Sequence, residues 1–203
     1  MKLLLFSDVH INRNRCDEII RKSKEVDLLI GAGDYGSVRR GVDKTIGWLN
    51  VIDKPAILVP GNSESDQELK EACKAWKSAT VLHGTSAEKF GYNFYGIGGG
   101  IPVTPFGSWS YDFTEEEGRE LLKDFKENSI LITHSPPFGV LDLNGSNQHC
   151  GSSAVKEVIE NKSPLLVVCG HVHESNGKKE RYKNVDVVNC GPSGMIYELP
   201  DLV

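Results

Sequence analysis

Short apolar runs recur along the chain, and each of them ends in a group of Gly, Asp, Asn or His residues. The runs begin at Leu3–Phe6 and continue within residues 27–34, 55–62, 129–134 and 165–173. Their length and their content of β-branched residues are typical of buried β-strands. We therefore predict five buried strands, each of which carries polar residues at its carboxyl end.

Amphipathic segments between these runs predict helices, at residues 15–24, 42–52, 66–76, 114–127 and 154–161. Asp34 follows Asp8 by 26 residues, and Asn62 follows Asp34 by 28. This spacing suits a strand–helix–strand unit, which takes about 30 residues. Since the carboxyl ends of parallel strands meet at one edge of a sheet, the polar strand ends are expected to lie together.

The remaining segments are less regular. Residues 80–84 and 89–97 predict strands, and residues 181–189 and 195–199 predict the closing strands of a second sheet. Two long loops, 101–112 and 138–151, are expected to shape a pocket. Trp109, Tyr111 and Phe138 are candidate walls for an organic group, and packing within their own loops is the alternative.

Composition restricts the class of protein. The 203 residues predict one domain over residues 1–203, with a sizeable core. A net charge of −5 provides no broad basic surface for a nucleic-acid polymer or an anionic membrane. No apolar stretch reaches the ~18 residues of a membrane span. The five cysteines are scattered and odd in number, as expected for reduced thiols in a cytoplasmic protein. The oligomeric state is left open.

Seven metal-ligating side chains stand at the predicted strand ends: Asp8, His10, Asp34, Asn62, His134, His171 and His173. Two carboxylates, one amide oxygen and four imidazoles suit manganese, iron or zinc better than calcium. Seven ligands exceed one ion's usual share and fit two ions with a bridging carboxylate. In an extended chain His171 and His173 would project to the same side. Separate capping or turn roles are the alternative for each residue.

The ordered motifs Asp8-x-His10, Gly33-Asp34, Gly61-Asn62-x-Glu64, His134 and Gly170-His171-Val172-His173 resemble those of the calcineurin-like metallophosphoesterases. The resemblance implies an α/β fold, a four-layer αββα sandwich of two mixed sheets. It also implies hydrolysis of a small phosphoester substrate by a metal-bridged hydroxide. The expected cofactors are two divalent metal ions, manganese first, with iron, zinc or magnesium as alternatives.

The resemblance further implies a position for each ligand. One metal would be bound by Asp8, His10 and His173, and the other by Asn62, His134 and His171. Asp34 would bridge the two ions. The division of the ligands between two metals comes from the family, since the residues alone do not assign it.

One position departs from the family pattern. Ser63 stands where the third motif often carries a histidine that assists protonation of the leaving group. A serine hydroxyl is a poor general acid at neutral pH. We therefore expect phosphodiesters, including cyclic nucleotides, to be favoured over alkyl monoesters. A phosphomonoesterase or protein phosphatase is the second hypothesis, and a non-catalytic metal-binding scaffold is the third.

Other residues are candidates for supporting roles. His149 would replace the missing motif histidine if its loop reached over the site; an exposed loop histidine is the alternative. Asn12, Arg13 and Arg15 follow the first motif and would bind substrate phosphate, unless they form a solvated helix start. Glu64 would support the ligands from behind.

Overall fold

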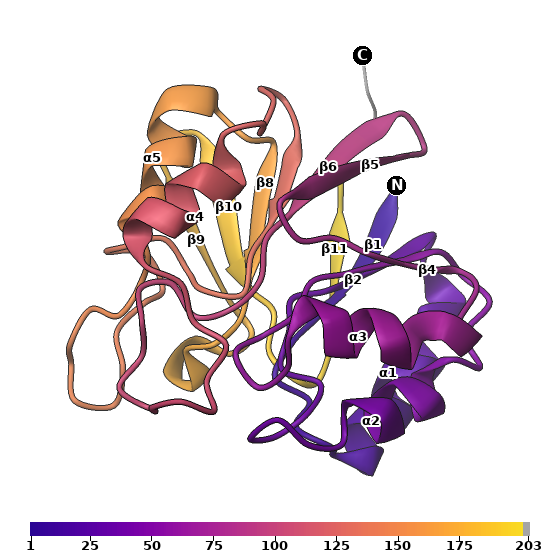
Figure 1. Ribbon diagram of the computed structural model, residues 1–203. Coiled ribbons are helices and arrows are strands. Elements are labelled where there is room, and N and C mark those ends of the chain that lie inside the picture. The colour runs from indigo at the N-terminus through magenta and orange to yellow at the C-terminus, as the bar shows by residue number, and fades with distance from the viewer. Residues whose placement is uncertain (201–203) are drawn as a thin grey trace.

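The two β-sheets lie face to face between two layers of helices, as the computed structural model describes for residues 1–200 (Figure 1). The first sheet has the strand order β11 (Met195–Glu198), β1 (Lys2–Phe6), β2 (Leu28–Gly31), β3 (Ala56–Leu58) and β4 (Ala79–Val81). The second has the order β5 (Thr85–Lys89), β6 (Tyr92–Gly96), β7 (Ile130–Ile132), β8 (Leu166–Cys169), β10 (Val185–Asn189) and β9 (Lys178–Tyr182). Both sheets contain parallel and antiparallel pairs.

Helices cover the outer face of each sheet. The first sheet packs against α1 (Arg13–Lys22), α2 (Val42–Leu49) and α3 (Asp66–Ala72). The second packs against α4 (Glu115–Leu122) and α5 (Ser153–Lys162). Short 3₁₀ helices follow at Ser23–Glu25, Cys73–Ala75 and His173–Ser175. The predicted α/β fold, a four-layer αββα sandwich, is confirmed.

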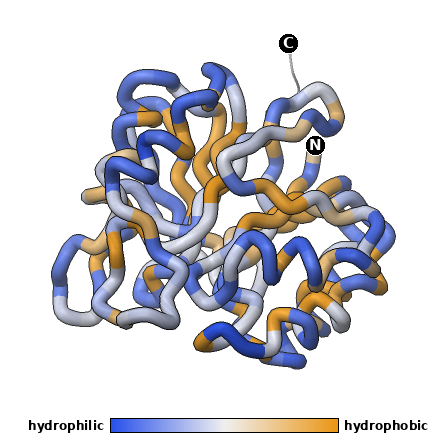
Figure 2. The backbone as a smooth tube through the Cα atoms, viewed as in Figure 1, coloured by the Kyte–Doolittle hydropathy of each residue, from blue (hydrophilic) through white to orange (hydrophobic). Residues whose placement is uncertain are grey.

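Strand periodicity distributes the apolar side chains among the layers. In β1, Leu3 and Leu5 belong to the core between the sheets, whereas Leu4 and Phe6 pack toward the helices. Alternate residues of a strand point to opposite faces, so one all-apolar run serves two cores. Figure 2 shows hydrophobic positions concentrated along the inner strands, with hydrophilic positions on the outer helices.

Two strand predictions and one sheet assignment were wrong. The segment 80–97 contains a separate hairpin, β5–β6, whose turn at Phe90–Gly91 has positive φ at both residues. Residues 181–189 likewise divide into parts of β9 and β10, because the chain turns at Lys183, where φ is 53°. The last strand, β11, belongs to the first sheet rather than the second, since it pairs antiparallel with β1.

The predicted start of α4 is confirmed, and its predicted end is not. The Thr114 hydroxyl accepts a hydrogen bond from the Glu117 backbone N–H at 3.2 Å, and the Glu117 carboxylate accepts one from the Thr114 backbone N–H at 2.8 Å. This reciprocal pair is a capping box. The helix ends at Leu122 rather than near Glu127. No helix within residues 1–200 is long and apolar enough to cross a membrane.

Candidate metal centre

Five strands deliver the seven predicted ligands to one end of the sandwich. In the first sheet β1, β2 and β3 are parallel neighbours, and in the second β7 and β8 are. All seven follow these strands directly, six in turns and His173 at the start of a 3₁₀ helix: Asp8, His10, Asp34, Asn62, His134, His171 and His173. Ligand sites in open α/β sheets form at this carboxyl end. Four of the seven, Asp8, Asp34, Asn62 and His134, are buried.

One half of the centre contains Asp8, His10 and His173, whose potential ligand atoms all lie within 4.8 Å of one another. The Nε2 atoms of His10 and His173 are 3.4 Å apart. Asp8 Oδ1 lies 3.6 Å from His173 Nε2. The three side chains therefore converge on a common point.

The other half contains His134 and Asn62, with Asp34 between the two halves. His134 Nε2 lies 3.2 Å from Asn62 Oδ1 and 3.5 Å from Asp34 Oδ1. The second oxygen, Asp34 Oδ2, lies 3.5 Å from His10 Nε2. The two oxygens of one carboxylate thus face histidines of different halves, as a bridging ligand requires.

Hydrogen bonds on the far side of each ligand show which atoms are free to bind a cation. The Nδ1 atoms of His10 and His134 lie 2.9 Å and 2.7 Å from the backbone oxygens of Gly36 and Ala32. Donation from Nδ1 leaves the lone pair on Nε2. The Asn62 amide nitrogen donates to the Ser110 hydroxyl at 2.8 Å, so its oxygen faces His134.

Acceptor atoms therefore face one another across the centre. With its lone pair on Nε2, His134 opposes the Asn62 amide oxygen and an Asp34 carboxylate oxygen, and these atoms repel unless a proton or a metal cation lies between them. Burial lowers the pKa of His134, but Asp34 and Asp8 outweigh it and raise that pKa, so the surroundings favour a positive charge at this point. The donor set of imidazoles, carboxylates and an amide oxygen is that of first-row divalent ions. The residues present fit a bound metal cation.

The turns that carry the ligands have an unusual backbone. Asp8, His10, Asp34 and His171 have φ of 55°, 44°, 58° and 69°, in the left-handed region. Asp and His enter this region more readily than most residues, and such conformations cluster at functional sites. A Cβ on Gly61 would lie 2.0 Å from Asp34 Oδ1, so only glycine permits this approach.

Glu64 ties two of these turns together. Its buried carboxylate accepts hydrogen bonds from the backbone N–H groups of Asp34 and Gly61, both at 2.8 Å, and of Gly36 at 2.9 Å. Burial and the neighbouring Asp34 raise the pKa of Glu64 to about 7. The predicted supporting position behind the ligands is the one that Glu64 occupies.

Burial and neighbouring charges set the protonation of the ligands. Burial opposes ionisation of Asp8, but His173, His134 and Ser7 outweigh it and lower its pKa to about 2. Burial and the adjacent His134 lower the pKa of His171 to about 4. At neutral pH Asp8 is thus ionised and His171 is neutral, which are the forms that bind metals.

The two histidines of the last motif do not project together from a strand. β8 ends at Cys169, His171 is in the left-handed region, and a 3₁₀ helix begins at His173. The turn is held by Asn189, whose amide donates to the backbone oxygens of Gly170 and Val172, both at 3.0 Å. The His171 ring lies 5.0 Å from that of His134, and the His173 ring lies 5.4 Å from that of His10. The expectation from an extended chain was wrong, and the pair divides between the two halves.

The three residues predicted to bind substrate phosphate, Asn12, Arg13 and Arg15, lie at the start of α1. Asn12 caps α1 by accepting a hydrogen bond from the Arg15 N–H at 3.3 Å. Arg13 bonds Asp17 at 3.0 Å, and Arg15 bonds the Ser193 hydroxyl at 2.6 Å. All three residues therefore form contacts at the start of α1, which agrees with the alternative of a helix start. A role in substrate binding stays a prediction.

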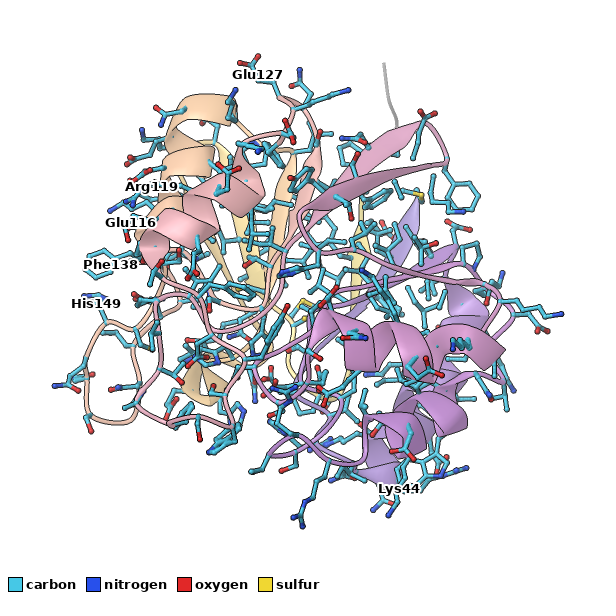
Figure 3. All side chains as sticks on the ribbon, viewed as in Figure 1. Lys44, Glu116, Arg119, Glu127, Phe138 and His149 are labelled. Atoms are coloured by element: carbon cyan, nitrogen blue, oxygen red, sulfur yellow. The ribbon has the colours of Figure 1, made fainter. Side chains whose placement is uncertain are left out.

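His149 turns toward its own loop. Its Nδ1 lies 2.7 Å from the buried Asp142 Oδ1, and its ring lies 5.1 Å from that of Phe138. Figure 3 shows His149 and Phe138 side by side at the outer edge of the molecule, below Glu116 in the first turn of α4. Proton donation by His149 therefore gains no support from its position.

Two serines beside the ligands were not predicted. The Ser7 hydroxyl donates to the Asp8 carboxylate, and the Ser110 hydroxyl accepts from the Asn62 amide. Ser7 directly precedes the first motif, so its place in the sequence was a usable signal. Ser110 stands 48 residues after Asn62 in an irregular loop, and no pattern in the sequence connects them.

A cavity of about 530 Å³ adjoins the centre. Its inner wall includes Asp34, Asn62, Ser63 and three of the predicted histidine ligands: His10, His171 and His173. The outer wall comes from both long loops, as expected, and includes Trp109. Tyr111 instead bonds Asp66 through its hydroxyl at 3.1 Å, and Phe138 packs on His149, so these two rings serve their own surroundings.

Comparison with known proteins identifies the family. The model of the calcineurin-like phosphoesterase family matches residues 1–175. This chain belongs to the calcineurin-like phosphoesterase family. A protein of Emericella nidulans named "Probable rhamnogalacturonate lyase C" is 31% identical over 178 residues, which cover 75% of this chain and 16% of that protein. The chain thus spans about a sixth of that relative's length, and the activity in its name is not transferred.

Two solved structures share the fold. TT1561 of Thermus thermophilus superposes with a TM-score of 0.76 at 20% identity, over 95% of this chain and 90% of that one. An archaeal phosphodiesterase superposes with a TM-score of 0.56 at 18% identity, over 94% of this chain and 84% of that one. At these identities the likeness establishes the architecture.

Proposed function

We propose that this protein is a metal-dependent phosphoesterase that hydrolyses phosphodiesters at a two-metal centre. Family membership supports phosphoester hydrolysis, and the facing acceptor atoms of the seven strand-end side chains support the two-metal centre. One ion would be held by Asp8, His10 and His173 and the other by Asn62, His134 and His171, with Asp34 shared. Manganese is the first ion to test, followed by iron, zinc and magnesium.

Two divalent ions, when bound, would lower the pKa of a water nucleophile and neutralise charge on the phosphoryl oxygens. The protein's own contribution is to fix the ligands. Backbone oxygens hold the rings of His10 and His134, and Glu64 holds the turn that carries Asp34. Preorganised ligands of this kind reduce the reorganisation that catalysis would otherwise require.

Proton supply is the observation that favours diesters. Ser63 donates its backbone N–H to Asp34 Oδ1 at 2.8 Å and its hydroxyl to Asp34 Oδ2 at 3.2 Å, so both groups are already engaged. Among the residues that line the cavity, the only histidines are predicted metal ligands, and burial raises the pKa of the Cys150 thiol. Poor leaving groups such as alkoxides need a proton, and this wall provides no acid for them.

The charges of the cavity lining also favour diesters over monoesters. The cavity lining described by the structure contains no lysine or arginine, whereas it contains the carboxylates of Asp34 and Glu174. A phosphodiester carries one negative charge, and a monoester carries up to two. The diester therefore needs less compensation from the protein beyond the metals.

A substrate panel tests the proposal. Alkyl monoesters, alkyl diesters and cyclic nucleotides are assayed with manganese, iron, zinc or magnesium, for wild type, Ser63→His and Ser63→Ala. We expect hydrolysis of diesters, slow hydrolysis of alkyl monoesters, and a gain on alkyl monoesters in Ser63→His alone. Rapid cleavage of alkyl monoesters by wild type, unchanged in Ser63→His, would overturn the diester preference. Metal binding without hydrolysis of any substrate would indicate a binding scaffold instead.

A further inference from the structure

The outer half of the cavity has a composition that the chemistry of the metal centre does not require. We propose that it binds a flat, uncharged aromatic group attached to the phosphoester, so that the preferred substrates are diesters bearing such a substituent. This inference rests on the proposed phosphoesterase function and adds the class of organic group. It assigns Val38, Phe106 and Trp109 as residues that determine specificity.

An aromatic platform forms part of this outer wall. The rings of Phe106 and Trp109 are stacked, with centroids 5.6 Å apart and planes inclined by 16°. Phe106 is 50% exposed and the neighbouring Val103 is 58% exposed, and both line the cavity. Exposed apolar groups gathered at one cavity mark a binding surface rather than scattered surface residues. A flat ring of the substrate would bury this surface by stacking.

Val38 lines the same cavity from the loop between β2 and α2, and its backbone is strained. Val38 and Arg39 form the centre of a tight turn in which Ser37 and Arg40 exchange backbone hydrogen bonds at 2.9 Å and 3.0 Å. Their φ angles are 48° and 60°. Such a turn favours Asn or Gly, and a β-branched residue is a true outlier there. The turn nevertheless presents a half-exposed valine to the cavity, and an apolar ligand provides a reason for it.

Hydrogen bonds also hold the aromatic wall at a fixed position relative to the metal centre. Trp109 directly precedes Ser110, whose hydroxyl holds the Asn62 amide at 2.8 Å and donates to Asp112 at 2.7 Å. Asp112 in turn accepts from the backbone N–H of Thr104 at 2.9 Å. This network ties both ends of the segment 104–112 together, so the wall is preorganised for a ligand whose phosphate lies at the metals.

The charges around the wall disfavour a second anionic group. The nearby Arg39 is paired with Glu68 at 2.8 Å, and no lysine or arginine lines the described cavity. Glu174 lies on the lining and would repel a carboxylate or a second phosphate. The favoured substituent is therefore uncharged as well as flat.

Binding of non-hydrolysable analogues tests this class directly. The probes are methyl(2-naphthylmethyl)phosphinic acid and ethyl(methyl)phosphinic acid, which contain no ester bond, carry the same single charge and differ in the ring. A third probe bears a carboxylate on the naphthyl ring. Their Kd values are measured by calorimetry on the manganese-loaded protein. We expect the naphthyl probe to bind about tenfold tighter than the ethyl probe, as one aromatic stack allows, and the carboxylate to remove this gain.

Variants locate the effect. Trp109→Ala and Phe106→Ala are expected to abolish the preference for naphthyl and to leave the Kd of the ethyl probe unchanged. Phe90→Ala, which removes an aromatic ring 58% exposed at the distant β5–β6 turn, is the matched control and should change neither Kd. Val38→Asn should raise the Tm, because Asn suits the turn, while it weakens naphthyl binding.

The outcomes separate this inference from the proposed function. Equal affinity for the naphthyl and ethyl probes, in a protein that hydrolyses diesters, would overturn the aromatic site and leave the phosphoesterase proposal standing. A preference that survives in the Trp109 and Phe106 variants would overturn the assigned residues. A protein that binds no probe and hydrolyses no diester would overturn both proposals.

Discussion

The strand-end centre and the 138–151 loop both place a histidine beside a buried carboxylate, yet the contacts differ in kind. In the loop, His149 Nδ1 and Asp142 Oδ1 are 2.7 Å apart, as in an ordinary hydrogen bond. The Asp142 carboxylate also accepts hydrogen bonds from the backbone N–H groups of Gly139 at 2.8 Å and Gly151 at 3.1 Å. The loop contact is therefore a closed structural pair.

At the strand ends the Nδ1 atoms of His10 and His134 are already bonded to backbone oxygens, so their Nε2 atoms face carboxylate and amide oxygens as acceptors. These contacts are incomplete without a cation. Proximity of a histidine to a carboxylate thus does not distinguish a metal site from a structural hydrogen bond within a loop. The hydrogen-bond partner of the other ring nitrogen distinguishes the two cases, because it decides which nitrogen carries the lone pair.

Replacing the shared carboxylate is expected to have the largest effect. Asp34→Asn removes a negative ligand from between the two halves. If this weakens charge stabilisation by several kcal/mol, as for a catalytic metal, kcat/KM falls by about 10³-fold. Metal content, measured by mass spectrometry, should fall with it.

Asp53→Asn, on the exposed loop before β3, makes the same chemical change away from the centre and should leave both quantities unchanged. Asp34→Asn with wild-type activity and metal content would remove the two-metal centre from the proposal. A folded Asp34→Asn protein, verified by circular dichroism, makes either result interpretable.

A smaller effect is expected for Ser110, which contacts the predicted metal ligand Asn62 and is not itself a predicted ligand. Ser110→Ala removes the hydroxyl that accepts from the Asn62 amide, so the amide is free to rotate its oxygen away from His134. Removing such an outer partner weakens metal binding by about 10–100-fold. Titration with manganese measures this, and excess metal should restore most of the activity. Ser108→Ala in the same loop is the control, and equal affinities for the two variants would contradict a positioning role for Ser110.

The sequence predicted the buried strands and the ligand set for the same physical reason. Long apolar runs dictate strands locally, and a parallel arrangement then brings residues such as Asp34 and Asn62 together whatever lies between them. The β5–β6 hairpin was missed because its turn at Phe90–Gly91 uses positive φ at a phenylalanine, which no turn preference indicates. β11 was misassigned because an edge strand of alternating exposure fits either sheet.

The specificity side of the cavity was less predictable. Trp109 was one of three aromatic candidates, and nothing in the sequence separated it from Tyr111 or Phe138. Their surroundings depend on contacts such as that between Tyr111 and Asp66, which are 45 residues apart. The prediction of His149 as a proton donor had the same weakness, since a loop position alone does not say which way a ring turns.

His149→Ala is expected to have the smallest effect, and it tests the loop half of the comparison. Because His149 is paired with Asp142 and its ring packs against that of Phe138, its loss should change kcat/KM on alkyl substrates far less than the 10²–10⁴-fold that a general acid contributes. Asp142 keeps two backbone donors, so the free energy of unfolding should fall by only about 1 kcal/mol, the worth of one hydrogen bond. Denaturant unfolding and steady-state kinetics measure the two quantities on one preparation. A 10²-fold loss of kcat/KM with unchanged metal content would mean that the loop closes over the centre during turnover, and that its histidine is the missing acid.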